Sequence, residues 1–153
     1  MTKSLIRYHV IFTSALIGLT VILGVINSFL DSGGLTGVSA VTPFLAATFA
    51  AHSFLNRERK IPNAAEKNKL ILTQLFIFLA LNALILALVF FSGVLGEILP
   101  DGTGGSTLLT IIGVVFAILA LINYFLMRWA YGGLLRKRAE KLGISEDQTD
   151  VFK

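Results

Sequence analysis

The residues of this sequence with the most obvious capacity for chemistry are two histidines. His9 begins one long uncharged apolar stretch, and His52 lies late in the next. If these stretches cross a membrane in opposite directions, both imidazoles lie at similar depth, where two neutral rings can ligate haem or a metal ion. Such a site requires the rings to face each other, and no third ligand type accompanies them. We therefore interpret His9 and His52 as interfacial side chains, and we expect no cofactor and no metal site.

The rest of the composition argues against most catalytic chemistry. The chain contains no cysteine, which excludes disulfides, thiolate metal sites and a cysteine nucleophile. No Asp, Glu, Lys or Arg lies at the centre of an apolar stretch, and a proton pump or a cation-coupled transporter needs such a group at depth. The segment from Gly102 to Gly105 follows no strand and holds no lysine, so it is interpreted as a turn rather than a phosphate-binding loop. We predict that the protein is not an enzyme.

Four uncharged apolar stretches carry most of the chain, at about residues 9–30, 37–55, 70–95 and 107–128. Hydrophobic residues make up 55% of the 153 residues and charged residues 14%, and a chain of this size cannot hide so much apolar surface from water. Each stretch is long enough for an α-helix to cross a hydrocarbon core, which takes ~20 residues, and helices satisfy their own backbone in lipid. We predict an all-α, polytopic membrane protein with a four-helix transmembrane bundle.

The connections between these stretches indicate the topology of the bundle. A short turn at residues 31–34 joins the first stretch to the second, and a glycine-rich segment at residues 96–106 joins the third to the fourth. Short turns between antiparallel helices favour two antiparallel hairpins packed against each other. We expect residues 1–143 to form a single transmembrane domain and residues 144–153 to form a polar cytoplasmic tail.

The positions of lysine and arginine select one orientation. All 13 of them lie at the N-terminus, in the segment 56–69, or at and beyond the end of the fourth stretch, whereas the other two connections carry only Asp31, Glu97 and Asp101. Because short cytoplasmic loops collect lysine and arginine, we predict that both termini lie in the cytoplasm. The net charge of +4 then faces anionic lipid head groups, and we expect no nucleic acid as a partner.

Local signals predict where two helices begin or end and where a third bends. Asn63 and Glu66 have the spacing of a capping box, which predicts that the third helix begins near Ala64. Gly143 is expected to end an extension of the fourth helix. Pro43 lies inside the second stretch, where it is expected to kink the helix because it removes one backbone hydrogen bond.

Two groups of residues are candidates for contact with other helices, lipids or partners. Small residues let helices approach closely in lipid, and a midspan asparagine can bond a neighbouring helix. A helix-packing role is predicted on this basis for Gly18, Ala46, Ala47, Ala50, Ala51, Asn82 and Gly113. Basic and aromatic residues beside the span ends attract anionic head groups or anchor the interface, although they can also serve only to set topology. Contact with lipid or a partner is predicted for Arg57, Arg59, Lys60, Arg128, Trp129, Tyr131, Arg136, Lys137 and Arg138.

Several short motifs connect the chain with a known group of proteins. They are Arg7-Tyr8, Pro43-Phe44, the segment from Phe54 to Pro62 with Glu66 after it, and the run from Arg128 to Gly132. In these motifs the chain resembles a family of small four-span proteins of proteobacterial inner membranes whose function is not established. The resemblance covers the chain up to about Gly143. It implies a four-helix fold in a bacterial inner membrane and supplies no activity, substrate or catalytic residue.

Three hypotheses of function follow from these observations. The first is an accessory or assembly subunit of a larger membrane complex, whose partners are other membrane protein subunits or a second copy of itself. The second is a small transporter or channel that works as an oligomer, with the small residues of the second stretch lining a shared path. The third is a haem carrier or membrane enzyme that uses His9 and His52. The absence of catalytic chemistry favours the first hypothesis.

Overall fold

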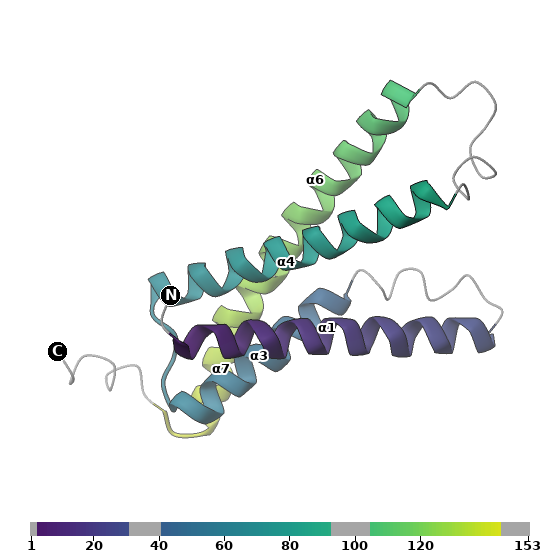
Figure 1. Ribbon diagram of the computed structural model, residues 1–153. Helices are drawn as coiled ribbons and strands as arrows, with labels where there is room; N and C mark the ends of the chain where they lie inside the picture. The colour runs from purple at the N-terminus through teal and green to yellow at the C-terminus, as the bar shows by residue number, and fades with distance from the viewer. Residues whose placement is uncertain (1–2, 31–40, 93–104, 145–153) are drawn as a thin grey trace.

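The computed structural model describes residues 3–30, 41–92 and 105–144, and every regular element within these ranges is a helix. In chain order these are α1 (Lys3–Leu30), α3 (Thr42–Glu58), α4 (Ala64–Phe91), α6 (Gly105–Trp129), the π-helix η2 (Ala130–Leu134) and α7 (Leu135–Lys141) (Figure 1). Since these ranges contain no strand, the predicted all-α class is confirmed for the described chain.

Three of the helical stretches are long and apolar enough to cross a membrane: Leu5–Ile26 in α1, Ala64–Phe91, which is the whole of α4, and Thr110–Lys141, which runs from α6 through α7. The length and apolar composition of these three helices confirm the prediction of a membrane protein. The fourth helix, α3, has 17 residues. At 1.5 Å per residue it is about 26 Å long, slightly less than the ~30 Å of a hydrocarbon core.

The first turn of α3 contains Pro43, and this overturns the predicted kink. The helix begins at Thr42, and Val41 is its N-cap residue. The first backbone N–H groups of a helix have no partner inside the helix, so a proline there loses no hydrogen bond, and its fixed φ suits the first turn. Pro43 therefore starts α3 instead of bending it. The proposed span from residue 37 lies partly outside the described residues.

Two predicted helix ends are confirmed in atomic detail. At the start of α4, the Asn63 side chain accepts a hydrogen bond from the backbone N–H of Glu66 at 2.8 Å, and the Glu66 carboxylate accepts one from the backbone N–H of Asn63 at 3.2 Å. At the end of α7, Gly143 has a φ of +68°, and the N–H of Ile144 donates to the carbonyl of Ala139 at 3.0 Å. This left-handed glycine with a bond back to the last turn is a Schellman motif.

A π-helical turn, which was not predicted, lies between α6 and α7 in the last long helical stretch. In η2 the helix widens, and the consecutive residues Ala130 and Tyr131 are both buried. The next two residues are Gly132 and Gly133. A Cβ atom on Gly132 would lie 2.9 Å from Nζ of Lys67, and one on Gly133 would lie 3.1 Å from the indole of Trp129. The side chains of Lys67 and Trp129 therefore pass close to the helix backbone at Gly132 and Gly133, where there is no Cβ atom.

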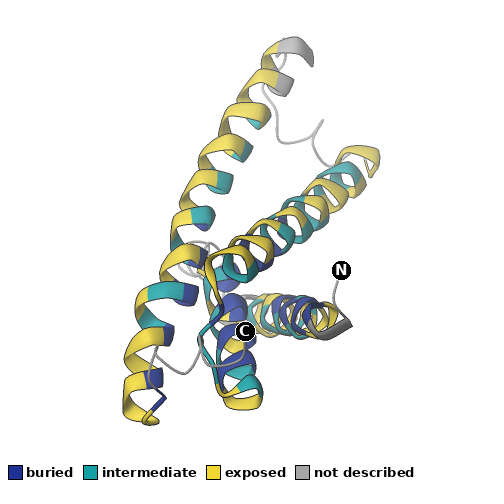
Figure 2. Ribbon diagram, turned by 90° about the vertical axis from the view of Figure 1, so that its left-hand side faces the viewer, coloured by how far each residue is buried: buried dark blue, intermediate teal, exposed yellow. Residues whose placement is uncertain are grey.

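The hydrophobic core occupies one end of the molecule. In α1 the buried residues form a stripe at three- and four-residue spacing that ends at Leu16, in α4 burial ends at Phe78, and in α6 it begins at Asn123. One broad face of α3 packs into this core, chiefly against α1 and also against α6, η2 and α7, whereas Leu45 and Phe49 on its other face are exposed. Away from the core, α4 and α6 diverge (Figure 1), and their surfaces are largely exposed (Figure 2).

Candidate functional site

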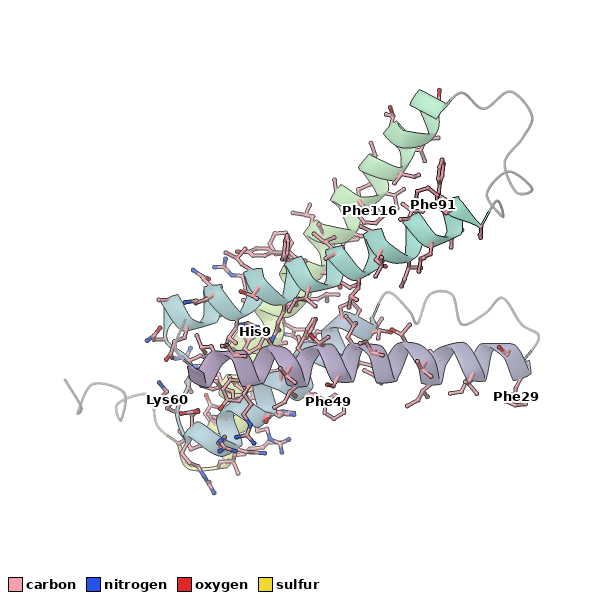
Figure 3. The ribbon with its side chains drawn as sticks, viewed as in Figure 1. His9, Phe29, Phe49, Lys60, Phe91 and Phe116 are labelled. Carbon is pink, nitrogen blue, oxygen red and sulfur yellow. The ribbon has the colours of Figure 1, made fainter. Side chains whose placement is uncertain are left out.

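Basic side chains gather at the end of the molecule that holds the core. We call this the basic end; it comprises the start of α1, the α3–α4 connection and α7, and Lys60 marks it in Figure 3, whereas Phe29 and Phe91 lie at the opposite end, which we call the apolar end. The end of α3 is bonded to α1 there, since the hydroxyl of Tyr8 donates a hydrogen bond of 2.7 Å to Glu58. The ring of Tyr8 also lies 5.0 Å from that of Phe54. The basic end is therefore a packed structure and not a set of loose loops.

Most of the residues predicted to contact lipid or a partner lie exposed at the basic end. These are Arg57, Arg59, Arg136, Lys137 and Arg138, whereas Arg128 and Trp129 are exposed at the end of α6. Lys60 is partly buried, forms an ion pair of 3.1 Å with Glu66, and lies 5.9 Å from the ring centroid of Phe54. Trp129 is 55% exposed and stacks on Phe44 with 5.5 Å between ring centroids.

Tyr131 corrects the prediction of an interfacial anchor. Its side chain is 1% exposed, and its hydroxyl oxygen accepts a hydrogen bond of 2.6 Å from the amide of Gln74 on α4. Tyr131 lies four residues after Met127 and four before Leu135, and all three share the buried face of this helix. Tyr131 is therefore a core residue of this chain and contacts neither lipid nor a partner.

The residues predicted to pack helices divide into two sets. The four alanines of α3 lie in the core with exposures of 0–1%: Ala46, Ala47, Ala50 and Ala51. By contrast, Cβ atoms added at Gly18 and Gly113 would meet nothing within 4 Å, so these two glycines lie at no contact between described helices. Asn82 donates its amide hydrogen bond to the carbonyl of Phe78 in its own helix at 2.8 Å, and not to a neighbouring helix.

The two histidines have different surroundings. His9 is buried beside α4, where it lines a groove with Thr73 and Ile77; neither of its ring nitrogens has a hydrogen-bond partner among the described residues. The positive charge of Lys69 on α4 acts on His9, whereas that of Arg138 on α7 acts on His52. Within the described ranges, no group of three or more His, Cys, Asp or Glu side chains could hold a metal ion.

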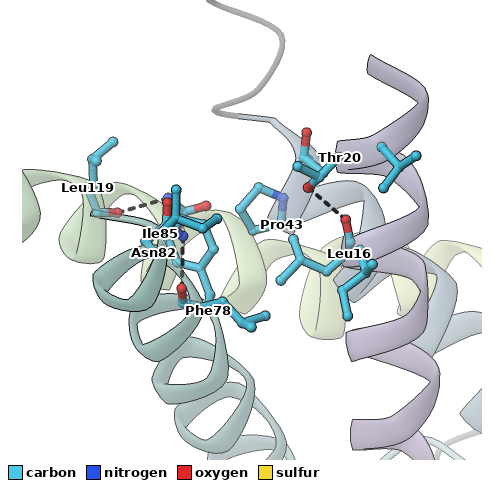
Figure 4. Close-up of a pocket in the computed structure, with 12 residues that line it drawn as sticks. Leu16, Thr20, Pro43, Phe78, Asn82, Ile85 and Leu119 are labelled. Atoms are coloured by element: carbon cyan, nitrogen blue, oxygen red, sulfur yellow. Dashed lines mark hydrogen bonds between the residues drawn. The ribbon is translucent and has the colours of Figure 1, made fainter. Parts of the chain in front are cut away.

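A cavity of about 450 Å³ lies where the core ends, and all four long elements contribute to its wall (Figure 4). Its apolar lining includes Leu16 and Val21 from α1, Pro43 from α3, Phe78 and Ile85 from α4, and Leu119 from α6. The cavity lies beside the first residues of α3, which begins at Thr42, whereas α1 and α4 each continue past this level.

Polar side chains from all four helices also line this cavity: Thr20, Thr42, Asn82 and Asn123. Asn82 donates one amide hydrogen to the carbonyl of Phe78 at 2.8 Å, and Asn123 donates one to the carbonyl of Leu119 at 2.9 Å. The hydroxyl of Thr20 donates to the carbonyl of Leu16 at 2.8 Å (Figure 4). The Oδ1 atom of Asn123 is buried without a hydrogen-bond partner in the described chain. Polar groups of this kind are uncommon in an apolar core, and each one calls for an explanation.

Two features of this region were not found from the sequence. One is that Asn123 lines a cavity, and the other is that the partner of Gln74 is Tyr131, 57 positions away. A helical projection of the fourth stretch puts Asn123 on the same face as Met127, and both are buried. That pattern could have indicated Asn123 as an inward residue, but no sequence signal indicates the cavity.

Comparisons of this chain with protein-family models, with curated proteins and with solved structures find no match.

Proposed function

We propose that this protein is a four-span protein of a bacterial inner membrane that acts as an accessory or assembly subunit of a larger membrane complex. The family resemblance in the motifs around Arg7 and Trp129 is part of the same proposal. No catalytic site is required by this function, and the support for it comes from two properties of the helices.

The first property concerns the number of crossings. α1 and α4 both begin at the basic end and are both long enough to span the membrane (Figure 1). The chain between Leu30 and Ala64 must therefore return to the basic end, and α3 is the described helix that makes this return. Because the basic residues share that end, the positive-inside rule supports a cytoplasmic location for it.

The second property carries the functional proposal: large parts of the long helices have no packing partner within the described chain. Among the described side chains, no buried residue follows Leu16 in α1 or Phe78 in α4, and none precedes Asn123 in α6. Gly113 and Ala117 on α6 are both exposed and four residues apart. A pair of small residues at this spacing lets a second helix approach closely in lipid, so α6 offers a helix of another subunit a contact surface.

The transporter alternative receives no comparable support. It required the small residues of the second stretch to line a shared path, but Ala46, Ala47, Ala50 and Ala51 are buried within the single chain. They are not available at an interface between copies.

The decisive experiment uses Gly113→Leu, because an added side chain there meets nothing within the described chain. The tagged protein is extracted in a mild detergent and examined by native mass spectrometry. We expect the wild type to carry a stoichiometric membrane subunit, and we expect Gly113→Leu to lose it without a change in thermal stability. Val115→Leu, on the opposite face of α6 and 47% exposed, is the matched control and should retain the subunit. A wild type that emerges alone, both here and after crosslinking in cells, would contradict the proposal.

A further inference from the structure

The cavity at the end of the core has the size and position of a small-molecule site that opens to lipid. Its volume is about 450 Å³, within the range of ligand pockets, which runs from about 300 to 1,000 Å³. Ile17, Val21 and Ile85 at its margin are each at least half exposed. In a membrane these exposed side chains face acyl chains, so a molecule dissolved in the bilayer reaches the cavity directly.

The charge of the lining restricts what can enter. Among the described residues, no Asp, Glu, Lys or Arg lines the cavity, and an ion inside a membrane needs a compensating charge or several polar ligands. The lining is otherwise apolar apart from Asn82, Asn123, Thr20 and Thr42. The occupant is therefore neutral and mostly apolar, with a small polar group.

The two amides determine which polar group fits. A primary amide has two N–H donors and one carbonyl acceptor, and each of these amides uses one N–H on the carbonyl four residues earlier in its own helix. The remaining capacity is one donor and one acceptor per amide, and Oδ1 of Asn123 has no partner within the described chain. A hydroxyl group both donates and accepts one hydrogen bond, which matches this capacity. An ether or a ketone only accepts, and a hydrocarbon does neither.

We propose that this cavity binds a membrane-soluble alcohol or phenol, whose hydroxyl group bonds the amides of Asn82 and Asn123 and whose apolar body lies against Leu16, Phe78 and Ile85. Asn82 is partly exposed and makes the first contact. Asn123, which is 1% exposed, supplies the acceptor that is left unpaired without the ligand. The site goes beyond the subunit role, since it needs only the membrane and no partner protein.

The test compares two probes that differ at the polar group, where a methyl group replaces the donor hydrogen of the hydroxyl. Binding of 4-(trifluoromethyl)phenol and of 4-(trifluoromethyl)anisole to the purified protein in detergent micelles is measured by fluorine NMR, with empty micelles as the blank. One additional hydrogen bond of about 1.4 kcal/mol corresponds to a tenfold difference in affinity. We expect the wild type to bind the phenol about tenfold more tightly than the anisole.

Three variants of the lining and one control separate the site from non-specific partition. Asn82→Leu and Asn123→Leu should bind both probes equally. Asn68→Leu is the control, because Asn68 is exposed on α4, the helix of Asn82, and it should keep the preference of the wild type. Ile85→Trp narrows the mouth of the cavity and should weaken the binding of both probes. If the wild type binds the two probes equally or binds neither, the cavity holds only water or acyl chains and the proposal is wrong. Should Asn123→Leu fail to fold, Asn82→Leu decides the question.

Discussion

Gln74 on α4 donates a hydrogen bond of 2.6 Å to the hydroxyl oxygen of Tyr131 on η2, and both side chains are at most 1% exposed. The bond joins α4 to the π-helical turn η2 within the core. The Oε1 atom of Gln74 has no partner in the described chain. The pair therefore fixes the position of η2 while leaving one polar atom unpaired.

Breaking this pair on one side is predicted to cost more than removing both sides. In Gln74→Leu the hydroxyl of Tyr131 loses its partner in the core, which should destabilise the protein by about 1–2 kcal/mol. In the double variant Gln74→Leu/Tyr131→Phe no unpaired polar group remains, so most of that stability should return. Thermal unfolding in mild detergent measures both variants. Tyr124→Phe, whose hydroxyl contacts the exposed Arg128, is the control and should change stability little; purely additive effects in the cycle would contradict this account.

The close approach of α3 to its neighbours is predicted to tolerate no larger side chain. Ala50 is completely buried, so Ala50→Leu must displace side chains of the adjoining helices. Overpacking of this kind costs about 1–3 kcal/mol. Ala83→Leu makes the same change at an exposed position of α4 and should leave the stability of the isolated protein unaltered. Equal thermal stability of the two variants would show that α3 is not packed as described.

At the start of α4, Glu66 makes two contacts, one in the capping box and one in an ion pair. Its Oε2 accepts from the backbone of Asn63, and its Oε1 bonds Lys60. Asn63→Ala removes the cap and should lower stability by about 1 kcal/mol. Glu66→Gln can keep the backbone contact but loses the ion pair, which is partly exposed and should contribute less than 1 kcal/mol. A larger loss in Glu66→Gln than in Asn63→Ala, measured by thermal unfolding, would reverse this ranking.

Sequence alone gives the features that depend on neighbours along the chain. The cap at Asn63 and the stop at Gly143 are local motifs, and the core alanines of α3 follow from the need for close approach in lipid. The hydrogen bond between Gln74 and Tyr131 could not be predicted, because it depends on how two distant helices rotate against each other. The start of α3 at Thr42 could not be predicted either, because hydropathy reports apolar length and not the first residue of a helix.

Two glycines near the end of the chain are predicted to respond oppositely to alanine. Gly143 has a φ of +68°, which an alanine adopts only with strain, so Gly143→Ala should destabilise the protein by about 1 kcal/mol. Gly132 lies inside η2, and its added Cβ would meet the flexible ammonium end of Lys67. Because Lys67 can move, Gly132→Ala should stabilise the protein by about 0.4–1 kcal/mol through a less flexible unfolded chain. Thermal unfolding of the two variants, compared with the wild type, checks both signs.

The proposed four-span topology predicts which positions a membrane-impermeant maleimide reaches from outside intact cells. The chain has no cysteine, so single cysteines can be introduced without removing native ones. Ser92→Cys, exposed at the end of α4, should be labelled, whereas Asn68→Cys and Lys141→Cys, exposed at the basic end, should react only after the membrane is permeabilised. If α3 did not return the chain across the bilayer, α4 would begin on the external side. In that case Asn68→Cys would be labelled in intact cells while Ser92→Cys would not, and the four-span topology would be wrong.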